Sequence, residues 1–167
     1  MDLGSDRPPV LDGPVPVITR ADLDDVRLLT FLQEHLGDLA PTAPPESRHA
    51  LDVDGLRGSG VRLWVAHDGG DVVGTIALAE IALGHDELKS MRTAPHRRGS
   101  GIGRLLLGHA LDDARERGVG RVSLETGSAD FFAPARALYR RAGFVECAPF
   151  ASYVEDPHSV FMTTTLR

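Results

Sequence analysis

One segment, residues 101–117, constrains the fold of this chain more than any other. Apolar residues recur in it at helical spacing, and charged residues occupy the remaining positions. Arg115 and Arg117 lie in the last turn, where cations suit the helix dipole, and Gly118 follows as a C-cap. The apolar face consists of Ile102, Leu105, Leu106, Leu107, Ala110, Leu111 and Ala114. A face this wide has to be buried, so we expect this helix to pack on another layer of the domain.

The rest of the chain supplies that layer. Apolar runs separated by Gly/Asp turns, such as the turn at 68–71, predict strands and a β-hairpin. The expected strands cover residues 17–20, 62–67, 72–81, 87–93, 121–126, 144–147 and 159–166. The other expected helices cover residues 24–36, 46–56 and 131–142, the last with Phe131, Ala135, Leu138 and Ala142 on one face. This order predicts a mixed sheet with helices on its faces, in an α/β or α+β layered domain.

The length of 167 residues is that of one domain. Residues 1–16 are rich in Asp, Gly and Pro and lack the basic start and apolar stretch of a signal peptide. We therefore expect a flexible N-terminal tail over 1–16 and a single domain over 17–167. Cys147 is the only cysteine, which excludes an internal disulfide framework. Both features favour a cytoplasmic protein.

The charge pattern narrows the class of partner. The net charge is −6, and an acidic chain repels the phosphate backbone of nucleic acids. Its one basic cluster is short and interleaved with glycine, which suits a single anionic small molecule better than a nucleic-acid track; it contains Arg92, Arg97, Arg98 and Arg104. No apolar run approaches the roughly 20 residues of a spanning helix, so we expect no membrane partner.

The glycine-rich turn at residues 98–103 is the strongest candidate for a ligand site. The start of a helix leaves main-chain N–H groups unpaired and carries partial positive charge, and glycines let a phosphate approach closely. A turn without any ligand is the competing interpretation of the glycines alone. A Walker loop is excluded because Arg104 and Leu105 stand where its Lys and hydroxyl belong. Leu106 replaces the third glycine of a dinucleotide fingerprint.

The turn also carries a family resemblance. Arg98-Gly99-Ser100-Gly101-Ile102-Gly103 resembles the R-x-x-G-x-G acyl-CoA motif of the GNAT acetyltransferase superfamily. Downstream, the residues Leu138-Tyr139-x-x-x-Gly143-Phe144 are also similar to that superfamily. The segment 87–91, the segment 124–127 and the tail at 147–162 resemble a group of small bacterial GNAT proteins of unassigned acceptor. The resemblance implies a mixed, mostly antiparallel sheet of six to seven strands flanked by about four helices.

The resemblance also implies how acetyl-CoA would be bound. Main-chain N–H groups of the turn hold the diphosphate, and the pantetheine arm runs along the preceding strand. The thioester lies in a gap where that strand and 122–126 splay apart. Carried onto this sequence, the cofactor-binding residues are Met91, Arg92, Thr93, Arg98, Gly99, Ser100, Gly101, Ile102, Gly103 and Arg104. Phe132 stands where the superfamily often has a CoA-contacting asparagine, so that contact is not assigned.

Tyr139 matches the tyrosine that often protonates the departing thiolate in the superfamily, with packing on the helix face as the alternative. Two carboxylates on strands flanking the gap are candidates for the general base, Glu87 first and Glu125 second; a solvated or salt-bridged carboxylate is the alternative for each. Period-two spacing predicts that Glu87, Lys89, Met91 and Thr93 share one face. Weaker alternatives for a catalytic role are His85, His158 and a covalently acylated Cys147.

Together these observations predict an N-acetyltransferase that moves an acetyl group to a primary amine of a small molecule or peptide. The predicted reaction is direct attack in a ternary complex, without a metal. A non-catalytic acyl-CoA-binding or regulatory domain is the alternative. Homodimers are common among the proteins that the chain resembles. The loop at 149–157 is long enough to cap the acceptor side, and four aromatic residues are expected in the core or the acceptor pocket: Trp64, Phe150, Tyr153 and Phe161.

Overall fold

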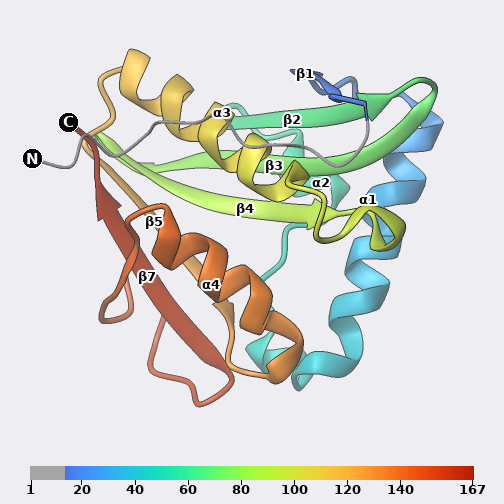
Figure 1. The fold of residues 1–167 in the computed structure, drawn as a ribbon. Coiled ribbons are helices and arrows are strands. Elements are labelled where there is room, and N and C mark those ends of the chain that lie inside the picture. Colours follow the sequence, from blue (N-terminus) through green and yellow to red (C-terminus); the bar gives the residue numbers. More distant parts are fainter. Residues whose placement is uncertain (1–13) are drawn as a thin grey trace, which may run out of the picture.

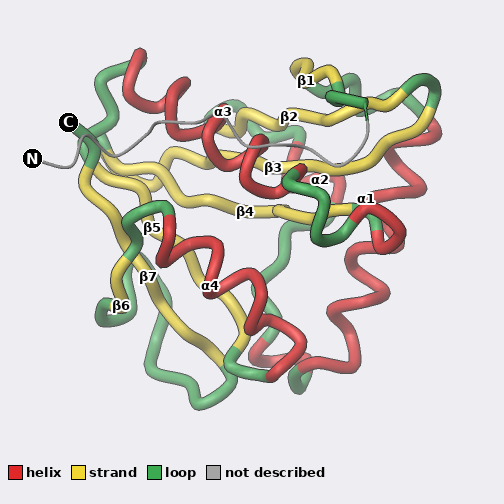
Figure 2. The backbone as a smooth tube through the Cα atoms, viewed as in Figure 1, coloured by secondary structure: helices red, strands yellow, loops and turns green. Residues whose placement is uncertain are grey.

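A computed structural model describes residues 14–167 and confirms the layered α/β architecture (Figure 1). One sheet has the strand order β1-β2-β3-β4-β5-β7-β6, in which only β4 and β5 run parallel. The strands are β1 (Val17–Arg20), β2 (Val61–Asp68), β3 (Asp71–Ala82), β4 (His85–Thr93), β5 (Arg121–Gly127), β6 (Val145–Glu146) and β7 (Ser159–Thr165). The α-helices are α1 (Val26–Leu39), α2 (Val53–Leu56), α3 (Ile102–Glu116) and α4 (Ala133–Arg141). Figure 2 shows the short β6 beside β7.

Helices cover both faces of the sheet, and each face has its own apolar core. Trp64 of β2, Leu106 of α3 and Tyr139 of α4 all belong to the larger core. The neighbouring β2 residue, Leu63, points the other way and belongs to the second core, together with Leu28 of α1. The strands between these layers are buried on both sides, which explains their nearly continuous apolar runs.

The helix predicted at 101–117 is confirmed as α3. Six residues of its predicted apolar face are buried, whereas Leu105 is only partly buried; the buried ones are Ile102, Leu106, Leu107, Ala110, Leu111 and Ala114. Gly101 at the N-cap has a left-handed φ of 91°, and Gly118 after the last turn has a φ of 78°. Glycine tolerates this conformation at little steric cost, so these residues set both ends of the helix.

Two helix predictions need correction. The helix expected at 46–56 is reduced to a 3₁₀ turn, Pro45–Ser47, and the four-residue α2. Asp52 accepts a hydrogen bond from Gly55 N at 2.8 Å and thereby starts a new short helix instead of continuing an earlier one. The helix expected from Phe131 starts at Ala133, and Phe131 is 48% exposed rather than part of the apolar face.

The strands β4 and β5 separate along their length. Their parallel pairing extends from His85 opposite Arg121 to Leu88 opposite Leu124. Beyond these residues β5 continues to pair with β7, and β4 continues to pair with β3. A gap therefore opens between β4 and β5 inside the sheet.

A β-bulge interrupts β4 beside this gap. Arg92 pairs with Thr75 and Lys89 pairs with Ala77, so two residues of β4 oppose one residue of β3. Ser90, inside the bulge, has a φ of 52°, a left-handed value that is rare for a residue other than glycine. Its carbonyl accepts a hydrogen bond from Thr75 Oγ1 at 2.8 Å, which holds the bulge in place.

The bulge divides the predicted common face: Glu87 and Lys89 share one face as predicted, but Met91 and Thr93 do not share it with them. Glu87 and Lys89 form an ion pair, and Lys89 pairs with Ala77 on the α1 side of the sheet. Met91 and Thr93 instead lie beside Gly103, the second residue of α3. A Cβ atom added to Gly103 would be 3.4 Å from Met91 Cε and 3.5 Å from Thr93 Oγ1. One extra residue in a strand reverses the faces of all residues after it.

The N-terminal tail predicted at 1–16 lies outside the described residues, apart from Pro14–Pro16. None of the helices formed by residues 14–167 combines the length and the apolar character needed to cross a bilayer.

Candidate active site

The predicted anion-binding turn connects β4 to α3 and has free main-chain donors. The first hydrogen bond of the helix runs from Leu105 N to Gly101 O at 3.1 Å, so the amides of Ile102, Gly103 and Arg104 precede the first helical donor and have no acceptor within the helix. Within residues 14–167, no side chain caps this end. Gly99 and Gly101, with φ values of 76° and 91°, shape the turn. These donors and the helix dipole fit a diphosphate.

The four arginines of the basic cluster differ in the contacts that their side chains make. Arg97 pairs with Asp68, at 2.5 Å, and so ties the turn to the end of β2. Arg98 and Arg104 are exposed, and neither forms an ion pair with any described residue. The Arg98 guanidinium lies 5.8 Å from the ring centre of Phe131. Only these two side chains of the cluster remain available to an anion at the turn.

The side chain of Arg92 is directed to α1 rather than to the turn. It is 7% exposed, donates to Phe31 O at 2.9 Å and pairs with Asp38 at 2.8 Å. Its guanidinium also lies 4.6 Å from the centre of the Phe31 ring. A role of this residue in cofactor binding is therefore limited to its main chain, and its side chain fastens α1 to the bulged strand.

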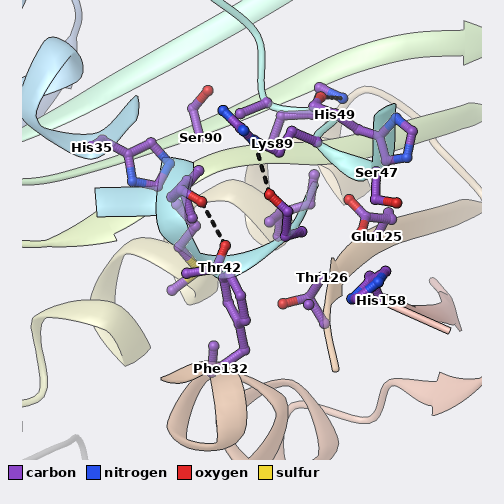
Figure 3. Close-up of a pocket in the computed structure, with 18 of the residues that line it drawn as sticks. His35, Thr42, Ser47, His49, Lys89, Ser90, Glu125, Thr126, Phe132 and His158 are labelled. Carbon is purple, nitrogen blue, oxygen red and sulfur yellow. Dashed lines mark hydrogen bonds between the residues drawn. The ribbon is translucent and has the colours of Figure 1, made fainter. Parts of the chain in front are cut away.

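A cavity of about 300 Å³ lies at the gap between β4 and β5 (Figure 3). Its walls come from α1, from residues 42–50, from both strands and from α4. Met91 lines the cavity and also lies beside Gly103 of the turn. Met91 therefore lies between the turn and the cavity. Candidate chemical groups on the cavity walls are His35, Glu87, Lys89, Glu125, Tyr139 and His158.

Tyr139 lines the cavity from α4 and is 5% exposed. Burial raises the pKa of its phenol well above the ordinary value, and the charge of Glu125 acts in the same direction. The phenol therefore stays protonated at neutral pH and can donate a proton or a hydrogen bond into the cavity.

The two candidate bases line the same cavity in different surroundings. Glu87 Oε1 accepts from Tyr153 OH at 2.5 Å and from Lys89 Nζ at 3.1 Å. Glu125 forms no ion pair with any residue of the described chain. Burial raises the pKa of Glu125, and the neighbouring Glu87 adds to the effect, whereas His49 and Lys89 oppose it. Glu125 is therefore the more available proton acceptor.

The loop at 149–157 contacts the sheet through Tyr153, whose hydroxyl donates to Glu87 of β4. Tyr153 contacts the rings of His49, Phe150 and Phe161 at centroid distances of 5.0, 5.1 and 5.5 Å. Its hydroxyl reaches Glu87, and burial followed by this hydrogen bond raises the pKa of the phenol far above its usual range. Trp64, in contrast, is buried in the α3 core.

The three weaker candidates, His85, His158 and Cys147, do not all line the cavity. His158 lines the cavity. His85 lies 2.7 Å from Ser123 Oγ through Nε2 and is not part of the lining. Cys147 follows β6, outside the lining as well, and burial raises the pKa of its thiol. A raised pKa makes a poor nucleophile at neutral pH.

Sequence reasoning did not assign a role to several cavity residues. Lys89 pairs with Glu87, and its i, i+2 spacing on a strand was a usable signal for that contact. His35 comes from α1; burial, and then the charge of Arg92, lowers its pKa to about 4. Arg48 and His49 come from a segment without regular structure, so no periodic pattern could identify them.

Comparison with known proteins places this chain in a family. The model of the acetyltransferase (GNAT) family matches residues 28–144. An uncharacterized N-acetyltransferase of Bacillus subtilis is 44% identical over 145 residues, which cover 87% of this chain and 96% of the relative. An IAA acetyltransferase of Azospirillum brasilense is 40% identical over 155 residues, covering 91% of this chain and 98% of the relative.

Solved structures agree with the sequence relatives. A candidate acyl-CoA N-acyltransferase from Klebsiella pneumoniae superposes with a TM-score of 0.74 at 28% identity, over 91% of this chain and 98% of that one. The chain therefore belongs to the acetyltransferase (GNAT) family and is an acyltransferase that takes an acyl-CoA as donor and delivers the acyl group to an acceptor.

Proposed function

We propose that the protein transfers an acetyl group from acetyl-CoA to a primary amine of a small molecule or peptide, by direct attack within a ternary complex. The observation that supports this most is the position of Met91, which lines the cavity and lies beside Gly103 of the α3 turn. The free amides at 102–104 would hold the diphosphate, and Arg98 and Arg104 would add positive charge. The thioester would then lie where β4 leaves β5.

The reaction removes two protons from the acceptor nitrogen and delivers one proton to the departing sulfur. An alkylammonium has a pKa of about 10.4, so the acceptor has to lose a proton before its nitrogen attacks the thioester carbon. Glu125 is proposed to take this proton. As the new C–N bond forms and the C–S bond breaks, the attacking nitrogen releases its second proton to water, and Tyr139 donates its phenolic proton to the departing sulfur and is reprotonated from solvent. A main-chain amide of β4 beyond Leu88 would stabilise the negative charge on the carbonyl oxygen.

Direct transfer is proposed because the one cysteine lies outside the cavity lining. The intact mass of the protein after incubation with acetyl-CoA alone tests this point. An unchanged mass is expected, and an acetyl group on Cys147 together with ping-pong kinetics would contradict a ternary complex.

The function itself is tested by incubating the protein with acetyl-CoA and a panel of amines, with detection of free CoA thiol and of acetylated amine by mass. Release of thiol with at least one amine is expected. Calorimetric binding of acetyl-CoA without thiol release across a broad panel would instead favour a non-catalytic acyl-CoA-binding domain.

A further inference from the structure

Charge balance in the cavity bears on which amines it can accept. Among residues 14–167, its lining contains two carboxylates, Glu87 and Glu125, and two basic side chains, Arg48 and Lys89. The three histidines of the lining add no negative charge. The described part of the lining therefore has no surplus of acidic over basic side chains with which to hold an acceptor of more than one positive charge.

Glu87 is committed to a partner of opposite charge. Lys89 Nζ lies 3.1 Å from Glu87 Oε1, and the two side chains are 11% and 8% exposed. Lys89 Nζ also donates to Tyr153 OH at 3.1 Å and to His49 O at 3.2 Å, so all three of its protons have acceptors. Removing one member of such a buried pair leaves the other charge uncompensated, which is strongly unfavourable.

Glu125 is the only lining carboxylate without an ion-pair partner among the described residues. An incoming ammonium group can therefore approach one available carboxylate. A second cationic group on the same acceptor would meet Lys89 and Arg48 without a matching acid. Like charges brought together in a partly buried site disfavour binding.

We infer that Lys89 is a specificity-determining residue: by neutralising Glu87 it restricts the acceptor to a small monoamine that carries no second cationic group, with Glu125 as the carboxylate that receives its ammonium. This inference rests on the proposed amine acetylation. It excludes diamines and polyamines as preferred acceptors, and it favours amines whose remaining part is neutral or acidic.

Three probes of one chain length test this preference: butylamine, 1,4-diaminobutane and 4-aminobutanoate. Thiol release from acetyl-CoA is measured with each, and the kcat/KM of the diamine is divided by that of butylamine. We expect the wild-type ratio to lie below one. A wild-type protein that prefers 1,4-diaminobutane would overturn the inference.

Lys89→Met tests the cause. The variant frees the carboxylate of Glu87, so the ratio of diamine to monoamine should rise by about tenfold or more. The double variant Lys89→Met/Glu87→Gln removes the freed charge and should bring the ratio back, and Lys89→Arg should keep it near wild type. Because each value is a ratio within one variant, a general loss of activity or folding cancels. An unchanged ratio in Lys89→Met would refute the role of Lys89.

Binding separates this inference from the proposed function. If no probe releases thiol, the acetylation proposal fails for these amines, and the same three probes are then titrated into the protein with CoA present, with NMR shifts of the cavity residues as the signal. Weaker binding of the diamine than of butylamine, reversed in Lys89→Met, would still support the charge argument. Equal binding of the two amines in both proteins would remove it.

Discussion

The ring of Phe132 lies against the main chain of Gly127, so that a Cβ atom at residue 127 would come within 2.1 Å of Phe132 Cδ2. The two residues form adjoining parts of the cavity wall where β5 ends and α4 begins. Only glycine fits beneath this ring, which explains why a flexible residue ends a central strand. The contact couples the shape of the cavity to the start of α4.

Gly127→Ala should destabilise the protein by roughly 1–3 kcal/mol, because the added methyl forces Phe132 out of its position. Urea unfolding measures the change in the free energy of unfolding. The same substitution in a Phe132→Ala background should cost much less, since the obstructing ring is gone. An equal cost in both backgrounds would mean that the contact with the ring is not the cause.

Two glycines at α3 should respond in opposite ways to alanine. Gly101→Ala forces a left-handed φ of 91° on a residue with a Cβ, which should cost about 1–2 kcal/mol and weaken CoA binding at the turn. Gly108 lies inside the same helix with open space around a Cβ, so Gly108→Ala should stabilise by about 0.5–1 kcal/mol. Thermal unfolding and calorimetric titration with CoA measure both effects. Weakened CoA binding in Gly108→Ala would show that the effect is not local to the turn.

Tyr139→Phe should reduce turnover by about 100-fold or more while changing CoA affinity little. The substitution removes only the phenolic oxygen of a buried residue, so the packing of α4 on the sheet is retained. Steady-state kinetics with an acceptor found in the amine panel gives kcat, and calorimetry gives the affinity for CoA. Wild-type turnover in the variant would leave Tyr139 with a packing role only.

Protonation of His35 should lower the free energy of unfolding as the pH drops. Burial lowers the pKa of His35 from 6.5 to about 4, so the folded protein binds this proton more weakly than the unfolded chain. Its contribution is therefore present above pH 6.5 and is lost as the pH falls toward 4, by on the order of 3 kcal/mol in total. His35→Gln should flatten this part of the profile, as measured by urea unfolding at several pH values. A wild-type slope in the variant would assign the pH dependence to other groups.

The ionised carboxylate of Glu125 should lower the free energy of unfolding at neutral pH. Its pKa is raised, mainly by burial, so the protonated form suits the folded state and stability falls as the pH rises above 4.5 through the folded pKa. Glu125→Gln should therefore raise the melting temperature at pH 7, and this gain should vanish below pH 4.5. The same variant should lose acetylation of alkylamines. A lower melting temperature at pH 7 would show that the charged carboxylate stabilises the fold.

The elements that the sequence predicted best are those with strong local signals. The α3 segment combines an apolar stripe with glycines at both ends, and the hairpins combine apolar runs with Gly/Asp turns, so each pattern needs no distant partner. The segment 46–56 has no comparably clear local signal, because Asp52 could end one helix or begin another. Its actual path depends on packing against the sheet, where Leu56 joins the α1 core.

The candidate site likewise has a part that local sequence signals predict and a part that depends on tertiary contacts. The sequence by itself determined the turn at 98–103, the helix that follows it and the presence of Glu87, Glu125 and Tyr139 on neighbouring elements, because these depend on glycine conformation and on periodicity within a few residues. Only the tertiary structure decided that a bulge at Ser90 turns Met91 toward α3, and that Tyr153 meets Glu87 across a sequence separation of 66 residues. Such contacts depend on which strands become neighbours and in which register, and that outcome is set by the packing of the whole sheet.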